Sequence, residues 1–138
     1  MIIKQISIFM ENTMGRLADV TALLAGAGIN LRALSIADTA EFGILRMVAD
    51  QPDMAVQLLK DAGFTARETD VIGIEVPDRP GELARIMALF RTEGVNIEYL
   101  YASLEHQSDK AVIILKVDDI NAGLAILENH GFVTNPSF

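Results

Sequence analysis

The sequence contains no cysteine and only two histidines. Without thiols the chain can form no disulfide, no thiolate metal site and no cysteine nucleophile. His106 and His130 are too few for a typical zinc or haem site, and we expect both at exposed positions in a loop or at a helix end. We therefore expect neither a bound metal nor a cofactor.

Basic residues are also scarce, since 11 lysines and arginines face 19 aspartates and glutamates and the net charge is −8. Such a protein repels a phosphate backbone overall. Neither a basic stripe nor a pattern of stacking aromatic residues counters that repulsion. We therefore expect no binding to nucleic acid.

Long apolar segments are missing as well. No apolar run approaches the length of a membrane span, and the chain opens directly on the strand-like run Ile2–Ile8. Because no basic region followed by a long apolar segment is present, we expect no signal peptide, no membrane contact and a cytoplasmic location. Apolar residues still make up 51% of the chain, which is typical of a globular protein.

The most informative feature of the sequence is an internal repeat. Three pairs of segments align in order, at offsets of 66, 66 and 68 residues: Glu11–Ala18 with Pro77–Ala84, Gly28–Leu31 with Gly94–Ile97, and Gly63–Phe64 with Gly131–Phe132. The agreement at glycines, an asparagine and apolar positions exceeds chance. The chain is therefore two copies of one module without a linker, and we expect domains at residues 1–70 and 71–138.

Each copy has the pattern strand, helix, strand, strand, helix, strand. In copy one, apolar residues alternate around Ile6 and Ile8, which predicts a strand, and recur at helical spacing from Leu17 to Ala27. The other elements are expected over residues 29–37, 43–49, 52–62 and 64–69 in copy one, and over 83–90, 95–104, 111–117 and 119–131 in copy two, with a turn at 105–110. With right-handed crossovers this order gives an α+β fold made of tandem ferredoxin-like βαββαβ modules. Each module is then an antiparallel four-stranded sheet with two helices on one face.

The repeated motifs resemble a known family. In copy two a strand leads into Asp78–Leu83, then a helix, then Gly94–Ile97, and this pattern resembles the ACT domain. Copy one carries the pattern at Asn12–Leu17 and Gly28–Leu31, but has Thr13-Met14 where family members often have a proline before the glycine. The resemblance covers essentially the whole chain, twice.

The resemblance implies a regulatory role. ACT domains are usually appendages of enzymes of amino-acid metabolism, pair edge to edge and bind amino acids at the interface. Because no catalytic domain accompanies the two copies, the chain resembles the small free-standing tandem members. The resemblance thus implies a sensor of an amino acid that regulates amino-acid metabolism, with a metabolic enzyme as a possible partner.

The residues themselves give a physical reason for a carboxylate site. Gly15 and Gly81 each follow a strand, where a glycine lets the backbone approach a ligand closely. The helix that begins there offers unpaired N–H groups and a partial positive charge. Asn12 and Asp78 precede these glycines by three residues and can cap the helices.

Two further asparagines, Asn30 and Asn96, are expected to enter the second strand of their copies beside that helix start. An amide side chain there can accept from an ammonium group and donate to a carboxylate. We prefer the site in copy one, because Met14 keeps an N–H group that Pro80 lacks in copy two. The candidate ligand-binding residues are Asn12, Met14, Gly15, Arg16, Leu17, Asn30, Ser35, Ile36, Ala37, Asp38, Asp78, Gly81 and Asn96.

Each candidate residue also has a purely structural interpretation. Asn12 and Asp78 can be simple helix caps, the glycines can serve a tight turn, and the later asparagines can be turn residues. Arg16 can be an ordinary solvated helix residue. The presence of the whole set in both copies is what favours a ligand.

Other functions are less consistent with the sequence. Ferredoxin-like acyl-phosphate hydrolases need an arginine-bearing phosphate loop; Arg79 lies in the first loop of copy two, but Pro80 removes an N–H group from such a loop. No glycine-rich phosphate loop, serine elbow or metal motif is present, so we assign no catalytic residue.

The alternative that stays open is a protein–protein interaction module without its own ligand that docks on a metabolic enzyme. Because small modules expose sheet edges, we expect a homodimer in either case.

Overall fold

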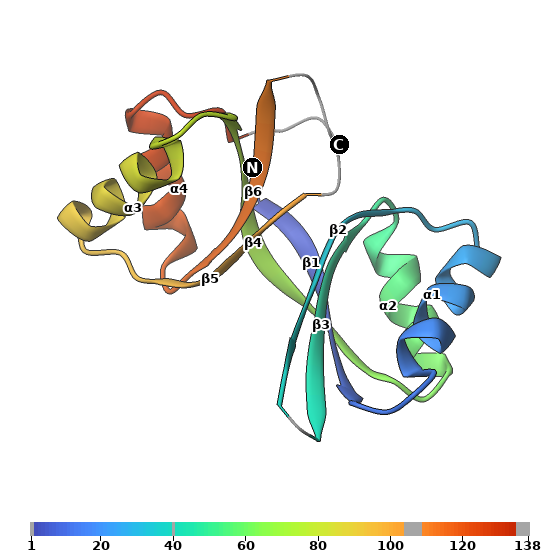
Figure 1. The fold of residues 1–138 in the computed structure, drawn as a ribbon. Coiled ribbons are helices and arrows are strands. Elements are labelled where there is room, and N and C mark those ends of the chain that lie inside the picture. Colours follow the sequence, from blue (N-terminus) through green and yellow to red (C-terminus); the bar gives the residue numbers. More distant parts are fainter. Residues whose placement is uncertain (1, 40, 104–108, 135–138) are drawn as a thin grey trace. The chain divides into compact units, whose positions relative to one another are not determined.

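The structure is a computed structural model that describes residues 2–39, 41–103 and 109–134. The turn expected at residues 105–110 lies mostly outside the described residues, as does His106. The elements of Figure 1 are β1 (Ile2–Glu11), α1 (Arg16–Gly26), β2 (Leu31–Asp38), β3 (Phe42–Ala49), α2 (Pro52–Asp61), β4 (Thr65–Pro77), α3 (Glu82–Glu93), β5 (Ile97–Ala102), β6 (Lys110–Val117) and α4 (Ile120–Asn129). Their order follows the pattern that the repeat predicts.

The chain folds into two compact units. The first unit is Lys4–Thr69, and the second unit is Asp70–Phe138 together with Met1–Ile3. No loop separates them, because β4 continues through the border between residues 69 and 70. The same strand therefore ends the first unit and begins the second.

Both units have the strand order of a ferredoxin-like fold. In the first unit the hydrogen-bonded order is β2-β3-β1-β4, and the antiparallel register pairs both Ile6 and Leu34 with Met47. In the second unit the order is β5-β6-β4, and an antiparallel bridge between Glu75 and Val133 takes the fourth position. The predicted α+β fold with antiparallel sheets is therefore confirmed.

In each unit two helices cover one face of the sheet, and the core lies between these layers. In the first unit Ile6 and Ile8 are fully buried in the core, while the alternate residues Ser7 and Phe9 face the other side of β1. Burying such an aliphatic side chain stabilises the fold by roughly 1.5–3 kcal/mol, so this alternation decides which face the helices cover. The second core repeats the pattern with Ile72, Ile74, Val76, Ile86, Phe90, Ile113, Leu115, Val117, Ile126 and Leu127.

The start of α4 carries a side-chain cap. Asp119 is the N-cap residue of α4, and its carboxylate accepts a hydrogen bond of 3.1 Å from the backbone N–H of Ala122. The bond satisfies one of the N–H groups that have no partner inside the helix. A carboxylate directly before a helix thus behaves here as its sequence position predicts.

Candidate functional site

The connection between β1 and α1 places a glycine at the start of a helix. Gly15 is the N-cap residue of α1, and its φ of +87° lies in the left-handed region that favours glycine. A Cβ atom built on Gly15 would meet no heavy atom within 4 Å, so the space above the loop is open. The N–H of Arg16 reaches only the carbonyl of Thr13, at 3.4 Å. This helix start can therefore accept a carboxylate oxygen.

Asn12 links this loop to the turn between β2 and β3. Its backbone N–H donates to the Glu41 carbonyl at 2.9 Å, and its side-chain Nδ2 donates to the Thr39 carbonyl at 3.3 Å and to Asp38 Oδ2 at 3.5 Å. The prediction that Asn12 caps α1 is wrong, because no side chain caps this helix and Gly15 itself occupies the cap position. The contacts of Asn12 instead hold Asp38 beside the loop. None of the described residues donates a hydrogen bond to Asn12 Oδ1.

Asn30 lies at the other end of α1. The helix has 11 residues and a length of about 16 Å, and Asn30 follows its C-terminal end whereas Gly15 precedes its start. The backbone N–H of Asn30 donates to Asp50 Oδ1 at 2.9 Å, and Asn96 has the equivalent bond to Asp118 at 3.1 Å. The expectation that these asparagines lie beside the helix start of their own module is therefore wrong.

The four candidate ligand-binding residues from Ser35 to Asp38 divide between the two faces of β2. Successive side chains of a strand point to opposite faces, so Ser35 and Ala37 lie on one face and Ile36 and Asp38 on the other. A Cβ atom built on the neighbouring Gly43 would lie 3.7 Å from side-chain atoms of both Ile36 and Asp38. Ile36 and Asp38 are exposed and share the helix-bearing face of the sheet. Of these four candidate residues, Ile36 and Asp38 are the ones that can face the loop.

Arg16 is held beside the helix start by two contacts. Its guanidinium carbon lies 4.6 Å from the centre of the Phe64 ring, and its Nη1 lies 3.6 Å from Asp19 Oδ2. Its Nε is buried and has no hydrogen-bond partner among the described residues. Arg16 thus packs on Phe64 and places a positive charge next to the open helix start. Asp19, Thr39, Glu41 and Phe64 also contact this arrangement and are not among the candidate residues predicted from the sequence.

Met14 and Leu17 form the rim of the same loop. Met14 is fully exposed and the side chain of Leu17 is 39% exposed, although both are apolar. Neither residue belongs to the core of the first unit. The loop therefore presents apolar side chains to its surroundings next to the open helix start.

The equivalent loop of the second unit has a different charge arrangement. Glu82 stands where the repeat has Arg16, and its carboxylate accepts a hydrogen bond from Arg79 at 2.9 Å and from Arg85 at 3.1 Å. The hydrogen bond from Arg79, aided by the nearby Arg85, lowers the pKa of Glu82 below its usual value. Arg85 also lies over the Phe132 ring, 4.6 Å from its centre. A carboxylate of the protein itself thus already occupies the start of α3.

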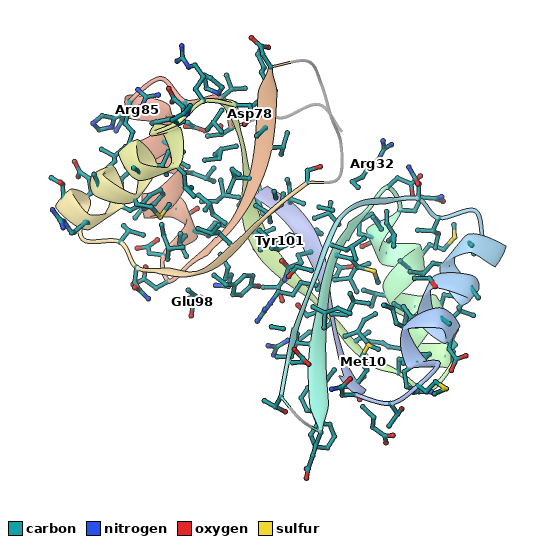
Figure 2. All side chains as sticks on the ribbon, viewed as in Figure 1. Met10, Arg32, Asp78, Arg85, Glu98 and Tyr101 are labelled. Atoms are coloured by element: carbon teal, nitrogen blue, oxygen red, sulfur yellow. The ribbon has the colours of Figure 1, made fainter. Side chains whose placement is uncertain are left out.

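Asp78, labelled in Figure 2, and Gly81 take the places that Asn12 and Gly15 have in the first copy of the repeat. Gly81 is the N-cap residue of α3 with φ of +91°, and no side chain caps the helix, so the prediction of an Asp78 cap is also wrong. The backbone N–H of Asp78 donates to the Asp109 carbonyl at 2.7 Å. The two loops therefore share their backbone arrangement but not their charges.

The chain matches the family described as the ACT domain pair over residues 1–137. It belongs to that family, as the two repeated loops and the duplicated ferredoxin-like fold indicate. A solved structure of protein BT0572 from Bacteroides thetaiotaomicron is similar, with 41% sequence identity, a TM-score of 0.91, and coverage of 96% of this chain and 91% of that chain.

Two further similar proteins have names that describe a function. The acetolactate synthase small subunit of Aquifex aeolicus is 29% identical in an alignment 146 positions long that covers 91% of this chain and 72% of that protein. The regulatory subunit of aspartate kinase from Thermus thermophilus has 17% identity and a TM-score of 0.67, with 93% of this chain and 92% of that chain covered. At that identity the second similarity shows the fold alone.

Two negative findings concern the described part of the chain. None of the helices formed by residues 2–39, 41–103 and 109–134 has the length and apolar character that a membrane crossing requires. The same ranges bring together no group of three or more histidine, aspartate or glutamate side chains that could hold a metal ion.

Proposed function

We propose that this chain is a non-catalytic regulatory protein that binds an amino acid at the loop between β1 and α1 of the first unit. The observation that carries the proposal is an open helix start at Gly15 with the carboxylate of Asp38 held beside it by Asn12. The helix start suits the carboxylate of an amino acid, and Asp38 suits its ammonium group. Membership of the ACT domain pair family and similarity to a protein named as a synthase small subunit support a regulatory role.

The first unit is the better candidate of the two. In the second unit Glu82 already lies at the helix start and is bound by two arginines. A ligand carboxylate there would be repelled by Glu82 and would compete with it for the same donors. In the first unit the corresponding residue is Arg16, whose charge favours an anion.

We further propose that the protein acts as a cytoplasmic homodimer with the amino acid at an interface between modules. Because Asn30 lies about 16 Å from the helix start of its own module, it can contact the same ligand only when a second chain supplies it. Strand β2 is an edge strand of the sheet, with β3 as its neighbour on one side. Its other side can pair with a strand of a second chain. The regulated partner is then an enzyme of amino-acid metabolism.

Calorimetric titration with each of the twenty amino acids tests the ligand. We expect at least one to bind, and Asp38→Asn to weaken that binding about tenfold or more, because a hydrogen bond to a charged group contributes roughly 1.5–3 kcal/mol. Glu93→Gln removes an exposed carboxylate from the second unit and is the matched control, expected to bind normally. Unchanged affinity in Asp38→Asn would contradict the placement of the ammonium group.

A protein–protein interaction module without its own ligand is the second candidate. The apolar rim of Met14 and Leu17 favours it, because exposed apolar side chains at a loop suit a protein surface. A thermal-shift measurement distinguishes an amino-acid sensor from an interaction module, because any ligand of the folded state raises the melting temperature. An absence of any shift with all twenty amino acids would favour the interaction module.

A further inference from the structure

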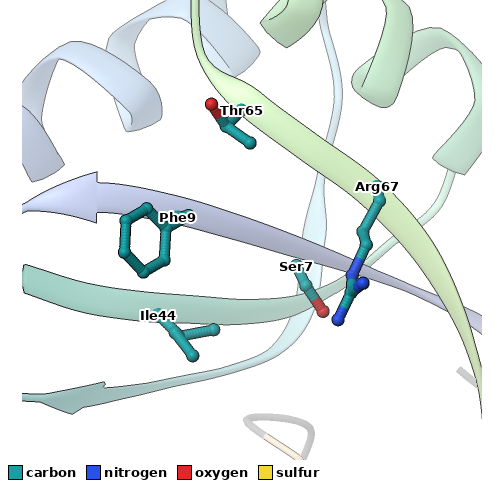
Figure 3. Close-up of a pocket in the computed structure, with 5 residues that line it drawn as sticks. All are labelled: Ser7, Phe9, Ile44, Thr65 and Arg67. Atoms are coloured by element: carbon teal, nitrogen blue, oxygen red, sulfur yellow. The ribbon is translucent and has the colours of Figure 1, made fainter.

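The helix-free face of the first unit carries a groove that the proposed function does not use. Ser7 and Phe9 of β1, Ile44 of β3, and Thr65 and Arg67 of β4 line it, as Figure 3 shows. Its volume is about 250 Å³, which suits a ligand of a few heavy atoms. Because these residues alternate with the core residues of their strands, the groove lies on the opposite face of the sheet from α1 and α2.

The groove has an apolar end. Phe9 is 50% exposed, and Ile44 is its direct partner in the antiparallel register. The Phe9 ring also stacks on Phe42, with 5.2 Å between the ring centres. An aromatic ring held in this way by its neighbour on the sheet provides a fixed apolar wall, because the stacking restricts its rotamers.

The other end of the groove is polar and cationic. Arg67 extends beside Ser7 (Figure 3), is exposed, and has no ion-pair or hydrogen-bond partner among the described residues. Thr65 adds a second hydroxyl group, and Arg46 lies directly opposite Ser7 in the register of β1 and β3. A guanidinium group with free donors recognises a carboxylate in a bidentate manner.

Acidic residues are absent from the described residues that line the groove. Glu11 shares this face of β1 but lies roughly 7 Å beyond Phe9, which separates it from Ser7 along the strand. A ligand ammonium group next to Arg67 would therefore meet a positive charge rather than a counter-ion. This charge pattern separates the groove from the loop at Gly15, where Asp38 is available.

We propose that this groove binds a small organic carboxylate that carries a compact apolar group and no ammonium group. The carboxylate lies on Arg67 and the hydroxyl groups of Ser7 and Thr65, and the apolar group lies against Phe9 and Ile44. The protein then has a second ligand class besides the amino acid, recognised on a different face of the same unit.

Three probes of the same carbon skeleton test the proposal: 4-methylpentanoate, leucine and 4-methyl-1-pentanol, with inorganic phosphate as the anion without an apolar group. We expect 4-methylpentanoate to bind in calorimetric titration and to shift the backbone amide NMR signals of Ser7 and Ile44. The other three probes should each bind this groove at least tenfold more weakly than 4-methylpentanoate. The alcohol lacks the carboxylate, leucine adds an ammonium group, and phosphate lacks the apolar group.

Two variants locate the site. Arg67→Gln should weaken binding of 4-methylpentanoate about tenfold or more, while Lys60→Gln, which removes an exposed cation from α2 of the same unit, should leave it unchanged. Leucine binding that persists in Arg67→Gln belongs to the Gly15 loop, so failure of one proposal is distinguishable from failure of the other. The proposal would be overturned if 4-methylpentanoate showed no saturable binding. It would also be overturned if Arg67→Gln bound 4-methylpentanoate as tightly as the wild type does, or if the alcohol or phosphate bound as tightly as 4-methylpentanoate.

Discussion

The reversed charges at the two helix starts allow a test that separates stability from binding. The first unit has Arg16 and Asp19 three residues apart, and the second has Glu82 and Arg85 at the matching positions. In both units the arginine lies 4.6 Å from the centre of a phenylalanine ring. The double variant Arg16→Glu/Asp19→Arg gives the first unit the arrangement of the second.

The expected change in the free energy of unfolding follows from these contacts. Arg16→Glu alone loses a partly exposed cation–π contact, which contributes roughly 0.5–1 kcal/mol. It also replaces the ion pair with Asp19 by a like-charge pair, which costs roughly 0.4–1 kcal/mol. A carboxylate in the first turn regains roughly 0.5 kcal/mol from the helix dipole. The net loss is about 1 kcal/mol, or a decrease of a few degrees in melting temperature.

The double variant should recover the wild-type stability to within about 0.5 kcal/mol, because the new arginine can lie over Phe64 as Arg85 lies over Phe132. Urea unfolding followed by circular dichroism measures the three variants against the wild type, with Asp19→Arg completing the cycle. The same double variant should lose amino-acid binding, because a side-chain carboxylate then occupies the helix start. A double variant as unstable as the sum of the single variants would refute the stability reasoning, and unchanged amino-acid affinity would refute the site.

Four further predictions concern other parts of the chain. Asp119→Ala should lower the free energy of unfolding by about 1 kcal/mol through loss of the α4 cap, and an unchanged urea midpoint would argue that the bond of 3.1 Å contributes nothing. Because the pKa of Glu82 is lowered in the folded state, its contribution to stability is present above its ordinary pKa of 4.5 and is lost as the pH falls through the folded pKa. Glu82→Gln should therefore weaken the pH dependence of the free energy of unfolding in that acidic range, which urea unfolding at several pH values would measure. Asn30→Ala should weaken amino-acid binding about tenfold in the dimer, whereas equal calorimetric affinity would mean that one module forms the site alone. Light scattering should report a homodimer, and a species of 15.0 kDa at working concentrations would count against it.

The sequence predicts the fold well because the repeat and the spacing of apolar residues depend on residues that are close together in the chain. Alternation around Ile6 and Ile8 determines the buried face of β1, and Asp119 precedes its helix directly, so both features could be read without knowing which elements meet. The division into residues 1–70 and 71–138 and the ligand-binding roles of the candidate residues stay predictions.

The misplaced candidates depend on contacts between distant segments. Asn12 lies three residues before Gly15, and its side chain is drawn to Asp38 and Thr39 on another hairpin, which no local pattern reveals. Asn30 is adjacent to the helix in sequence but lies at its far end in space. The groove at Arg67 was missed for the same reason, since its lining comes from three strands that the sequence separates by up to 60 residues, from position 7 to position 67.

The unbroken strand β4 has a consequence for how such a pair can be taken apart. Its 13 residues run from Thr65 to Pro77, and the border between the two compact units falls inside it. Proteases cut extended, unpaired segments, so the peptide bonds around residues 69 and 70 should resist limited digestion although they join two modules. A half-length chain cut at this border would expose a severed strand that invites aggregation.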